Sequence, residues 1–491
     1  MPLIPLTIPP GIFRNGTALQ GAGRWRDCNL VRWRDGIMRP VGGWEERVSV
    51  ATDSVRAAIA WADNDGDQRF AAGTATKLWT VSASNTVTDI TPAGITTGLE
   101  DATVETGYGY GFYGAGYYGT PRPDTGNYSE ADTWSLDTWG EFLVGCLTSD
   151  GKIYEWQLNV ANDAAVVTNA PTGCLGLVVT DERFLFALGA GGNVRKVQWC
   201  DRENNTSWTP SATNEAGDIE LQTNGQIMCG LRTRGQTLIL TDVDAHVATY
   251  QGPPFVYGFQ RVGTSCGSIS RKAAVNVDQG AFWMGQRGFF VYQGDTVTEI
   301  PSEVGDYVFD NINSAQQSKI VALSNAQNGE IWWFYPSEGS TENDAYVAYS
   351  YRENHWTIGS LERTGGFDRG VFRTPIWFDS AGMSFNHEVG FNHDGASVYA
   401  ESAPVQLGNG DQWMVVTDMI PDEATQGDVE ATFKTKDYPN GTELTFGPYD
   451  MANPTSVRFQ GRQIVVRFDQ TRNSEWRVGA MRFDARPGSR R

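Results

Sequence analysis

Residues 139–158 read WGEFLVGCLTSDGKIYEWQL, two apolar runs separated by a polar turn at Ser149, Asp150 and Gly151. Glycine and aspartate favour tight turns, and the flanking runs are rich in the aromatic and branched residues that favour strands. The stretch therefore predicts a β-hairpin. The same arrangement recurs along the chain at 55–81, 183–200, 236–252, 280–294, 330–351 and 387–402.

These hairpin units recur at intervals of roughly 40 to 50 residues, which is the period of four-stranded propeller blades. One small sheet cannot cover both of its apolar faces, whereas sheets stacked around an axis cover one another. We therefore predict an all-β fold with a β-propeller over residues 51–402, of about six to eight blades with seven as the central expectation. A pair of β-sandwiches is the alternative.

Beyond the propeller the sequence changes character, because the expected strands are longer and alternate more clearly. Ile464, Val466 and Phe468 share one face of such a strand. Residues 403–491 are therefore expected to form a C-terminal β domain, either a small sandwich or a sheet of its own. Residues 1–50 are expected to form an N-terminal extended segment with the first strands.

The net charge of −20 over 491 residues is unevenly distributed. Residues 1–50 hold seven arginines against four carboxylates, and residues 455–491 hold nine against three, so the ends carry +3 and +6 and the middle carries −29. An acidic body repels polyanions, which argues against nucleic-acid binding by most of the chain but lets DNA pass without adhering. Arginine supplies 31 of the 38 basic residues, which is typical of interfaces and also of composition bias.

Several kinds of chemistry are disfavoured by the motifs. The six cysteines form no C-x-x-C pair or cluster and predict buried free thiols. DNDGD at 63–67 lacks the glycine and the closing glutamate of a calcium loop and predicts a hairpin turn. His387 and His393 match no metal-site spacing and are expected to be surface imidazoles, and no G-x-S-x-G or P-loop occurs. We expect no catalytic residue, no metal and no cofactor, hence no enzyme.

The first residues, MPLIPLTIPPGIF, are apolar but contain four prolines and no basic region, unlike a signal peptide. No run approaches the roughly 18 apolar residues of a spanning helix. The protein is therefore expected to be made in a reducing cytoplasm.

Residues 107–124, GYGYGFYGAGYYGTPRPD, contain two overlapping G-x-G-x-x-G matches. A dinucleotide site needs a buried strand before the glycines and a helix after them, and the flanking sequence supports neither. Alternating glycine and tyrosine instead predicts a projecting loop over 105–130 that orders against a neighbouring molecule. A flexible surface loop is the alternative.

Four stretches together resemble the tail hub and nozzle proteins of short-tailed bacteriophages, some of which are called packaged-DNA stabilisation proteins. They are RWRDCNLVRWRDGIMRPVGGWE at 24–45, the Gly/Tyr loop followed by TWSLDTWGEFLVGC, the region Thr249–Ser337 with TYQGPPFVYGFQRVGTSCGSIS and IWWFYPS at its ends, and the C-terminal WRVGAMRFDARPGSRR. They are distributed over nearly the whole chain.

The resemblance implies a structural virion protein of a phage tail. Such a protein carries a propeller, assembles as a homo-oligomeric ring that is commonly a hexamer, and lies below the portal and adaptor proteins. There it extends the channel for double-stranded DNA, which it does not bind sequence-specifically, and retains the packaged genome until ejection. Two other functions remain open: a carbohydrate-active propeller hydrolase acting on host surface polysaccharide, and a monomeric interaction scaffold.

Ring assembly requires that one surface meet a different surface of the next copy, and aromatic and arginine side chains are enriched at such interfaces. We therefore expect subunit or partner contacts at Tyr108, Tyr110, Phe112, Tyr113, Tyr117, Tyr118, Arg24, Arg26, Arg32, Arg34 and Arg39. The alternative for the arginine-rich segment is that its tryptophans, Trp25, Trp33 and Trp44, are ordinary core.

The motif RWRDGIMRP within this segment has its own two interpretations. Strand alternation places Arg32 and Arg34 on one face and Trp33 on the other. Basic residues interleaved with aromatics can bind single-stranded nucleic acid. Because Asp27 and Asp35 are close in sequence, a structural strand with ion pairs is favoured.

Overall fold

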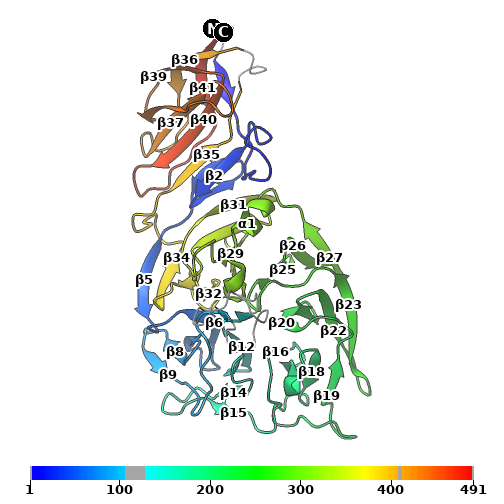
Figure 1. Ribbon diagram of the computed structural model, residues 1–491. Coiled ribbons are helices and arrows are strands. Elements are labelled where there is room, and N and C mark those ends of the chain that lie inside the picture. The colour runs from blue at the N-terminus through cyan, green and yellow to red at the C-terminus, as the bar shows by residue number, and fades with distance from the viewer. Residues whose placement is uncertain (1–2, 105–127, 407–411, 489–491) are drawn as a thin grey trace, which may run out of the picture.

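A computed structural model describes residues 3–104, 128–406 and 412–488, which form two bodies lying end to end (Figure 1). The larger body is a ring of small sheets, and the smaller one lies beyond one edge of the ring with both chain ends at its far tip. The described helices are short: α1 (Gly305–Asn311) and the 3-10 turns η1 (Ala190–Gly192) and η2 (Ser314–Lys319). None of them has the length and apolar character needed to cross a membrane.

In the described part of the chain the larger body consists of seven antiparallel four-stranded sheets, which we number as blades 1 to 7 in chain order. The innermost strands are β6 (Val55–Ala62), β12 (Trp134–Trp139), β16 (Gly176–Val179), β20 (Ile227–Thr233), β24 (Ala274–Val277), β28 (Val321–Asn325) and β32 (Gly365–Phe367). The second strands are β7 (Gln68–Thr74), β13 (Phe142–Leu147), β17 (Leu185–Leu188), β21 (Gln236–Thr241), β25 (Gly280–Met284), β29 (Glu330–Tyr335) and β33 (Ile376–Phe378). The third strands are β8 (Leu78–Ser82), β14 (Ile153–Trp156), β18 (Lys196–Trp199), β22 (Asp244–Gly252), β26 (Phe289–Gln293), β30 (Ala345–Ser350) and β34 (Met383–His387). The outer strands are β9 (Val87–Asp89), β15 (Ala165–Val166), β19 (Gly217–Glu220), β23 (Val256–Thr264), β27 (Thr296–Ile300), β31 (His355–Ser360) and β5 (Trp44–Ser49).

The seven inner strands form a closed ring, because each contacts the next and β32 contacts β6. The outer strand of blade 7 is β5, which comes from near the N-terminus and pairs antiparallel with β34. The two ends of the propeller are thus joined within one sheet. The predicted all-β propeller is confirmed, and its seven described sheets lie at the centre of the expected range.

The hairpin that opened the sequence analysis has its turn where it was expected. β13 ends at Leu147 and β14 begins at Ile153, with Leu143 opposite Trp156 and Cys146 opposite Ile153. Gly151 has φ +64°, a left-handed conformation that glycine adopts without a steric penalty. Apolar side chains on both faces of such hairpins then pack between neighbouring blades.

The smaller body is a sandwich of two antiparallel sheets. The first sheet has the order β1 (Ile4–Leu6), β41 (Met481–Pro487), β36 (Met414–Ile420) and β39 (Thr455–Gly461). The second has the order β2 (Trp25–Asn29), β35 (Tyr399–Ser402), β40 (Gln463–Gln470), β37 (Val429–Lys436) and β38 (Leu444–Asp450). Phe433 joins the sheets, because its ring lies 4.8 Å from that of Phe459 and 5.6 Å from that of Phe483.

Three boundaries differ from the sequence expectation. Residues 1–50 do not form a separate unit, since β1 and β2 belong to the sandwich while β5 completes blade 7. The stretch 387–402 is not a blade hairpin, because β34 ends at His387 and β35 pairs with β2 and β40 in the sandwich. The propeller therefore ends before residue 399 rather than at 402. In all three places the strand's partner is far away in the sequence, so local patterning does not identify it.

The two bodies share a continuous buried core. Trp25 of β2 lies 5.9 Å from Phe468 in the sandwich and 5.8 Å from Trp33, whose ring meets His355 of blade 6 edge-on at 6.2 Å. Trp33 belongs to a short hairpin formed by β3 (Val31–Arg34) and β4 (Ile37–Pro40). All three tryptophans that the sequence left open as core, Trp25, Trp33 and Trp44, are buried.

Candidate functional site

The aromatic residues expected to contact a neighbouring molecule, Tyr108, Tyr110, Phe112, Tyr113, Tyr117 and Tyr118, lie outside the described residues. The structure does describe the base from which this segment leaves the propeller. It is a two-residue pairing of β10 (Thr103–Val104) with β11 (Tyr128–Ser129), inserted between blade 1 and blade 2.

This base is tied to blade 6, on the far side of blade 7 from blade 1. The Gln316 side chain of η2 accepts from Ala102 N (3.0 Å) and donates to Ala102 O (3.1 Å). The Ser318 hydroxyl accepts from Ala131 N at 3.2 Å. Backbone groups on both sides of the inserted segment are therefore held by one 3-10 turn, which fixes the point at which the segment leaves the propeller.

Buried charges strengthen the same anchor. The ammonium of Lys319, whose side chain is fully buried, contacts Asp101 and lies 2.7 Å from Glu342. Glu342 also accepts from Arg56 of the inner strand of blade 1, at 2.6 and 2.9 Å. Burial raises the pKa of Glu342, but Arg56 and Lys319 outweigh it and hold that pKa below the ordinary value. Glu342 therefore stays charged at neutral pH, and the cluster crosslinks blade 1 to blade 6.

The predicted arginines do not form one surface. Arg24 makes a two-pronged contact with Glu303 beside α1, where both side chains are partly exposed. Arg26 is partly buried, and burial together with nearby Arg14 lowers its pKa. The Arg24–Glu303 pair joins the start of the sandwich strand β2 to the segment between β27 and α1.

Arg32 was expected to contact a second molecule, but the structure places it in the interior. It is buried between Glu330 of blade 6 and Glu388, with contacts of 2.9 Å to Glu330 and 2.5 to 2.9 Å to Glu388. It has no surface to offer a second molecule in this conformation. The ion-paired strand favoured from the sequence is present, but the partners are these two distant glutamates and not Asp27 or Asp35.

The three buried charges influence one another strongly. Burial lowers the pKa of Arg32, yet Glu330 and Glu388 raise it above the ordinary value. Glu388 accepts from Arg32 and from the Asn325 amide at 2.7 Å, and these donors outweigh burial and lower its pKa. One cation thus serves two carboxylates, and the pKa of Glu330 is raised by burial and by the second carboxylate.

Arg34 and Arg39 are the members of the set that remain available. Arg34 is exposed and Arg39 is partly exposed, and neither makes a hydrogen bond or ion pair with any described residue. Burial lowers the pKa of Arg39, and the neighbouring charges of Arg477 and Arg34 lower it further. Glu475 and Asp35 act in the opposite direction and partly raise it, so the β3–β4 hairpin presents a surface of mixed charge next to the sandwich.

Charge is divided between the two bodies. Residues 51–397, which include nearly all of the propeller, contain 41 carboxylates and 20 basic side chains, a balance of −21. The remaining residues, mainly the sandwich and the N-terminal segment, contain 17 carboxylates and 18 basic side chains, a balance of +1. The acidic character of the chain is therefore a property of the propeller.

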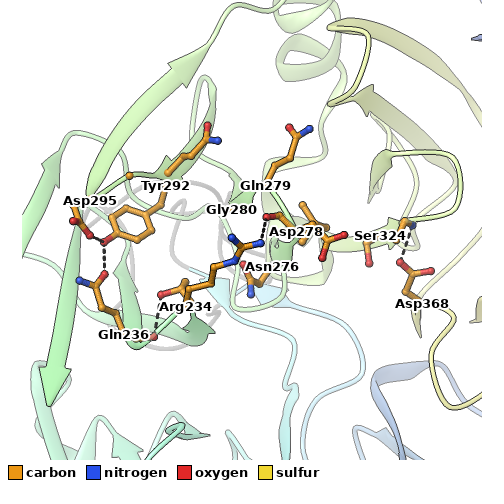
Figure 2. A pocket seen from close by; sticks show the side chains of 15 residues that line it. Arg234, Gln236, Asn276, Asp278, Gln279, Gly280, Tyr292, Asp295, Ser324 and Asp368 are labelled. Atoms are coloured by element: carbon orange, nitrogen blue, oxygen red, sulfur yellow. Dashed lines mark hydrogen bonds between the residues drawn. The ribbon is translucent and has the colours of Figure 1, made fainter. Parts of the chain in front are cut away.

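A polar pocket of about 750 Å³ lies on one face of the propeller, at the turns of blades 4 to 7 (Figure 2). Tyr292 donates to Gln236 at 2.6 Å and to Asp295 at 3.1 Å. Burial and Asp295 raise the pKa of Tyr292 to about 12, so its hydroxyl stays protonated. Asp368 accepts from Ala326 N at 2.8 Å, and burial raises its pKa. These polar groups already hydrogen-bond to one another or to the backbone of the pocket wall, and the pocket has room for a small polar molecule.

Sequence reasoning did not identify this pocket. Its acidic members, Asp278, Asp295 and Asp368, stand in short turns whose Asp and Gly residues are typical of any tight turn. Only the ring arrangement brings the turns of different blades together. No signal in the sequence distinguishes them from turns that line no pocket.

The histidines expected at the surface are instead buried. The rings of His387 and His393 lie 5.5 and 5.3 Å from that of Trp44, so the two residues do meet around one side chain. His387 accepts from Arg363 at 2.9 Å, and burial lowers its pKa well below the ordinary value. Within the described ranges no group of three His, Cys, Asp or Glu side chains could hold a metal ion.

The cysteines follow the expectation of buried free thiols. All six are free, and Cys229 alone among them is not classed as fully buried. Burial raises the pKa of Cys174, Cys200 and Cys229 to about 12 and that of Cys266 to about 11. These thiols are therefore protonated and weakly reactive at neutral pH.

No protein-family model and no curated protein matches this chain. Among solved structures, virginiamycin B lyase from Staphylococcus aureus is similar with 8% identity and a TM-score of 0.43, over 70% of this chain and 98% of the lyase. The WD40 propeller domain of Doa1 has 10% identity and a TM-score of 0.40, over 70% of this chain and 97% of that domain. PorZ of the type-IX secretion system of Porphyromonas gingivalis has 10% identity and a TM-score of 0.38, over 85% of this chain and 46% of PorZ. These likenesses concern the propeller fold alone.

Proposed function

We propose that this chain is a structural protein of a phage tail, a nozzle or hub. It forms a ring below the portal and adaptor proteins, extends the DNA channel and retains the packaged DNA until ejection. It acts in the virion tail and catalyses no reaction.

The observation that carries the proposal is the division of charge. A propeller with 41 carboxylates against 20 basic side chains repels the phosphate backbone, so double-stranded DNA moves past it without adhering. A conduit wall needs this property. The near-neutral sandwich, with its exposed arginines, is left to bind other proteins.

The segments that resemble nozzle and hub proteins also meet in space. Met38, in the first of these segments, exchanges backbone hydrogen bonds with Val478, in the last. The two N···O distances are 3.3 and 3.0 Å. The resemblance therefore extends over one folded junction between the two bodies, which supports a likeness of the whole chain over the borrowing of one domain.

Mixing the purified chain with portal and adaptor proteins tests the proposal. Electron microscopy should show the chain as a ring that continues the portal channel. Replacing Phe112 and the five loop tyrosines with serine should weaken ring assembly and leave the propeller folded, because the loop leaves the propeller from a rigid anchor. Val160→Ser, which alters an exposed apolar residue of blade 2, is the control. A chain that never joins the portal complex contradicts the proposal.

The alternative hydrolase makes a different prediction. The polar pocket holds Asp278, Asp295 and Asp368, and paired carboxylates are the groups that a glycosidase uses. If the wild-type chain cleaves host surface polysaccharide and the double variant Asp278→Ala, Asp368→Ala does not, the hydrolase replaces our proposal. We expect no cleavage by either protein.

A further inference from the structure

The chain crosses between the sandwich and the propeller twice, and the two crossings lie against each other. The first crossing, residues 30–43, leads from β2 to β5, and the second, residues 388–398, leads from β34 to β35. Their backbones are hydrogen-bonded, since Gly43 N donates to Gly390 O at 2.9 Å and Val389 N donates to Gly43 O at 3.0 Å. A hinge between the two bodies would therefore have to open this contact.

Two buried histidines hold the crossings together. His387 ends β34 and His393 lies on the second crossing, and each is 2% exposed. Both rings pack against Trp44, the first residue of β5, at 5.5 and 5.3 Å. His393 also reaches the first crossing directly, because its Nε2 lies 2.9 Å from Val41 O.

The hydrogen bonds of both histidines require the neutral imidazole. Arg363 Nε donates to His387 Nε2 at 2.9 Å, and a nitrogen that accepts a hydrogen bond carries no proton. Protonation there would set two N–H donors and two positive charges against each other. His393 donates through Nε2, and its Nδ1 is buried without a hydrogen-bond partner among the described residues. A proton on Nδ1 would thus be a buried donor without an acceptor.

The surroundings of His387 do not compensate a positive charge. Burial lowers its pKa, and Arg363 and His393 lower it further. Arg363 is 4% exposed, and within the described ranges its Nη2 is buried without a hydrogen-bond partner. Burial lowers the pKa of Arg363 to about 10, although Asp379, Glu362 and Asp394 act in the opposite direction. His387 therefore faces a cation that is itself poorly neutralised.

The surroundings of His393 are more mixed. Burial lowers its pKa below the ordinary value, although the carboxylates of Glu388 and Asp394 favour its charged form. Both carboxylates already have partners, since Glu388 accepts from Arg32 at 2.5 and 2.9 Å and Asp394 accepts from Trp44 Nε1 at 2.6 Å. The closed junction therefore disfavours protonation of His393 as well.

His355, the third histidine at this junction, differs from the other two. It packs edge-on against Trp33, and burial lowers its pKa. Its Nδ1 lies 4.0 Å from the partly exposed carboxylate of Glu353, which would become its ion-pair partner on protonation. Protonation of His355 is therefore tolerated better in the closed junction.

Hydrogen bonds connect His393 to the contact between the sandwich and blade 6. Val41, whose carbonyl accepts from His393, donates through its N to Leu30 O at 2.8 Å. Leu30 N in turn donates to the Tyr346 hydroxyl of blade 6 at 2.8 Å. Leu30 has φ +53°, a left-handed conformation that leucine rarely adopts and that the surrounding contacts must impose. Loss of the His393 contact would weaken that constraint at the end of β2.

We propose that His387 and His393 form an acid-sensitive latch, which holds the sandwich against the propeller while both imidazoles are neutral and opens when they take up protons. Opening exposes both rings to water, where the charged form is well solvated. Acid therefore separates β2 from blade 6 before it unfolds either body. The inference does not depend on the proposed tail function.

The direction and size of the effect follow from the protonation equilibrium. Both folded-state pKa values lie below the ordinary value of about 6.5, so the latch is fully stable above that pH and loses stability as the pH falls below it. Each histidine raises the opening equilibrium up to about tenfold per pH unit in this range. Between about pH 7.5 and about pH 5 the rise is about 30-fold for one histidine and up to about 900-fold for two.

Cys28 is a native reporter of this opening. It lies on β2, beside β31 of blade 6 (Figure 1), and its buried thiol is 3.1 Å from Ile358 O. The other five cysteines all lie in the propeller. The full-length protein is treated with 4,4′-dithiodipyridine, which also reacts with thiols in acid, and mass spectrometry of its peptides gives a rate for each cysteine relative to an unstructured cysteine peptide.

We expect the relative rate of Cys28 to rise at least about 30-fold from about pH 7.5 to about pH 5, and those of the other five cysteines to change less than about threefold. An equal rise at all six thiols would mean that acid unfolds the whole protein, and the proposal would be wrong. A constant rate at Cys28 would overturn it as well.

Histidine variants identify the groups responsible. His387→Gln with His393→Gln cannot become charged, and a glutamine amide oxygen can still accept from Arg363, so the double variant should lose most of the rise at Cys28. His355→Gln, at the same junction, is the matched control and should keep it. Where the double variant does not fold, His393→Gln alone should remove about half of the rise on a logarithmic scale. An unchanged rise in these latch variants, or its loss in His355→Gln, overturns the proposal.

Discussion

Replacing Arg32 with methionine would remove the cation from the ion cluster that joins the N-terminal segment to blade 6. The Arg32 side chain is 8% exposed, and those of Glu330 and Glu388 are 9% and 10% exposed. The variant therefore leaves two buried carboxylates without their counter-charge. Breaking a buried ion pair costs about 3–5 kcal/mol, and we expect a loss of that size in the free energy of unfolding at neutral pH.

The loss should depend on pH. In the variant, burial without a cation raises the pKa of both glutamates above that of the unfolded chain, so the penalty grows as pH rises above about 4.5 and is absent when both groups are protonated. In the wild type, Arg32 and Asn325 lower the pKa of Glu388, and the stability this provides is lost as pH falls. Both effects make the free energies of unfolding of the variant and the wild type more similar as the pH falls.

Guanidinium unfolding followed by tryptophan fluorescence, at about pH 7.5 and about pH 5, measures both quantities. Arg24→Met is the control, because the partly exposed pair of Arg24 and Glu303 should contribute less than about 1 kcal/mol. Adding Glu330→Gln and Glu388→Gln to the Arg32 variant should recover much of the loss. The reasoning is refuted if Arg32→Met lowers the free energy of unfolding no more than Arg24→Met does, or lowers it by the same amount at both pH values.

Three further predictions follow from the packing, the thiols and the pocket. Gly73→Ala should lower the free energy of unfolding, measured with denaturant, by about 1–3 kcal/mol, because the added Cβ would lie 2.4 Å from Trp134. Gly370→Ala is the control and should change that free energy little, because a Cβ added there would meet nothing within 4 Å. Almost none of the six thiols should react with iodoacetamide in the native protein at neutral pH, whereas all six should react after denaturation. Rapid reaction of several thiols in the native protein would contradict their burial. Asp278→Ala with Asp368→Ala should leave ring assembly unchanged, and impaired assembly in a folded double variant would show that the pocket lies in an interface.

The parts of the fold that depend on local patterning could be predicted. The run WGEFLVGCLTSDGKIYEWQL specified both strands and the turn at Gly151, and its recurrence indicated the propeller. In the sandwich, the expected alternation is present, with Ile464, Val466 and Phe468 buried and Val465 and Arg467 more exposed. In each case the determining contacts lie within a few residues, where strand alternation and turn chemistry act.

The parts that depend on distant partners could not be predicted. Arg32 lies 298 residues from Glu330 and 356 from Glu388, while Asp27 and Asp35 are close by and were the natural expectation. Polar His387 was expected at the surface, but Trp44 of the distant strand β5 and Arg363 of the segment between β31 and β32 enclose it. Nothing in a short window of sequence encodes such partners, because they follow from ring closure.

The pairing of β5 with β34 has a consequence for synthesis. Trp44–Ser49 leaves the ribosome early, whereas Met383–His387, the strand that receives it, is translated more than 300 residues later. At cellular elongation rates of about 5–20 residues per second, this edge stays without its partner for on the order of tens of seconds. Closure of blade 7 is thus a late event in the synthesis of the chain, and cells that make this protein must keep β5 from pairing with other polypeptides until β34 is available.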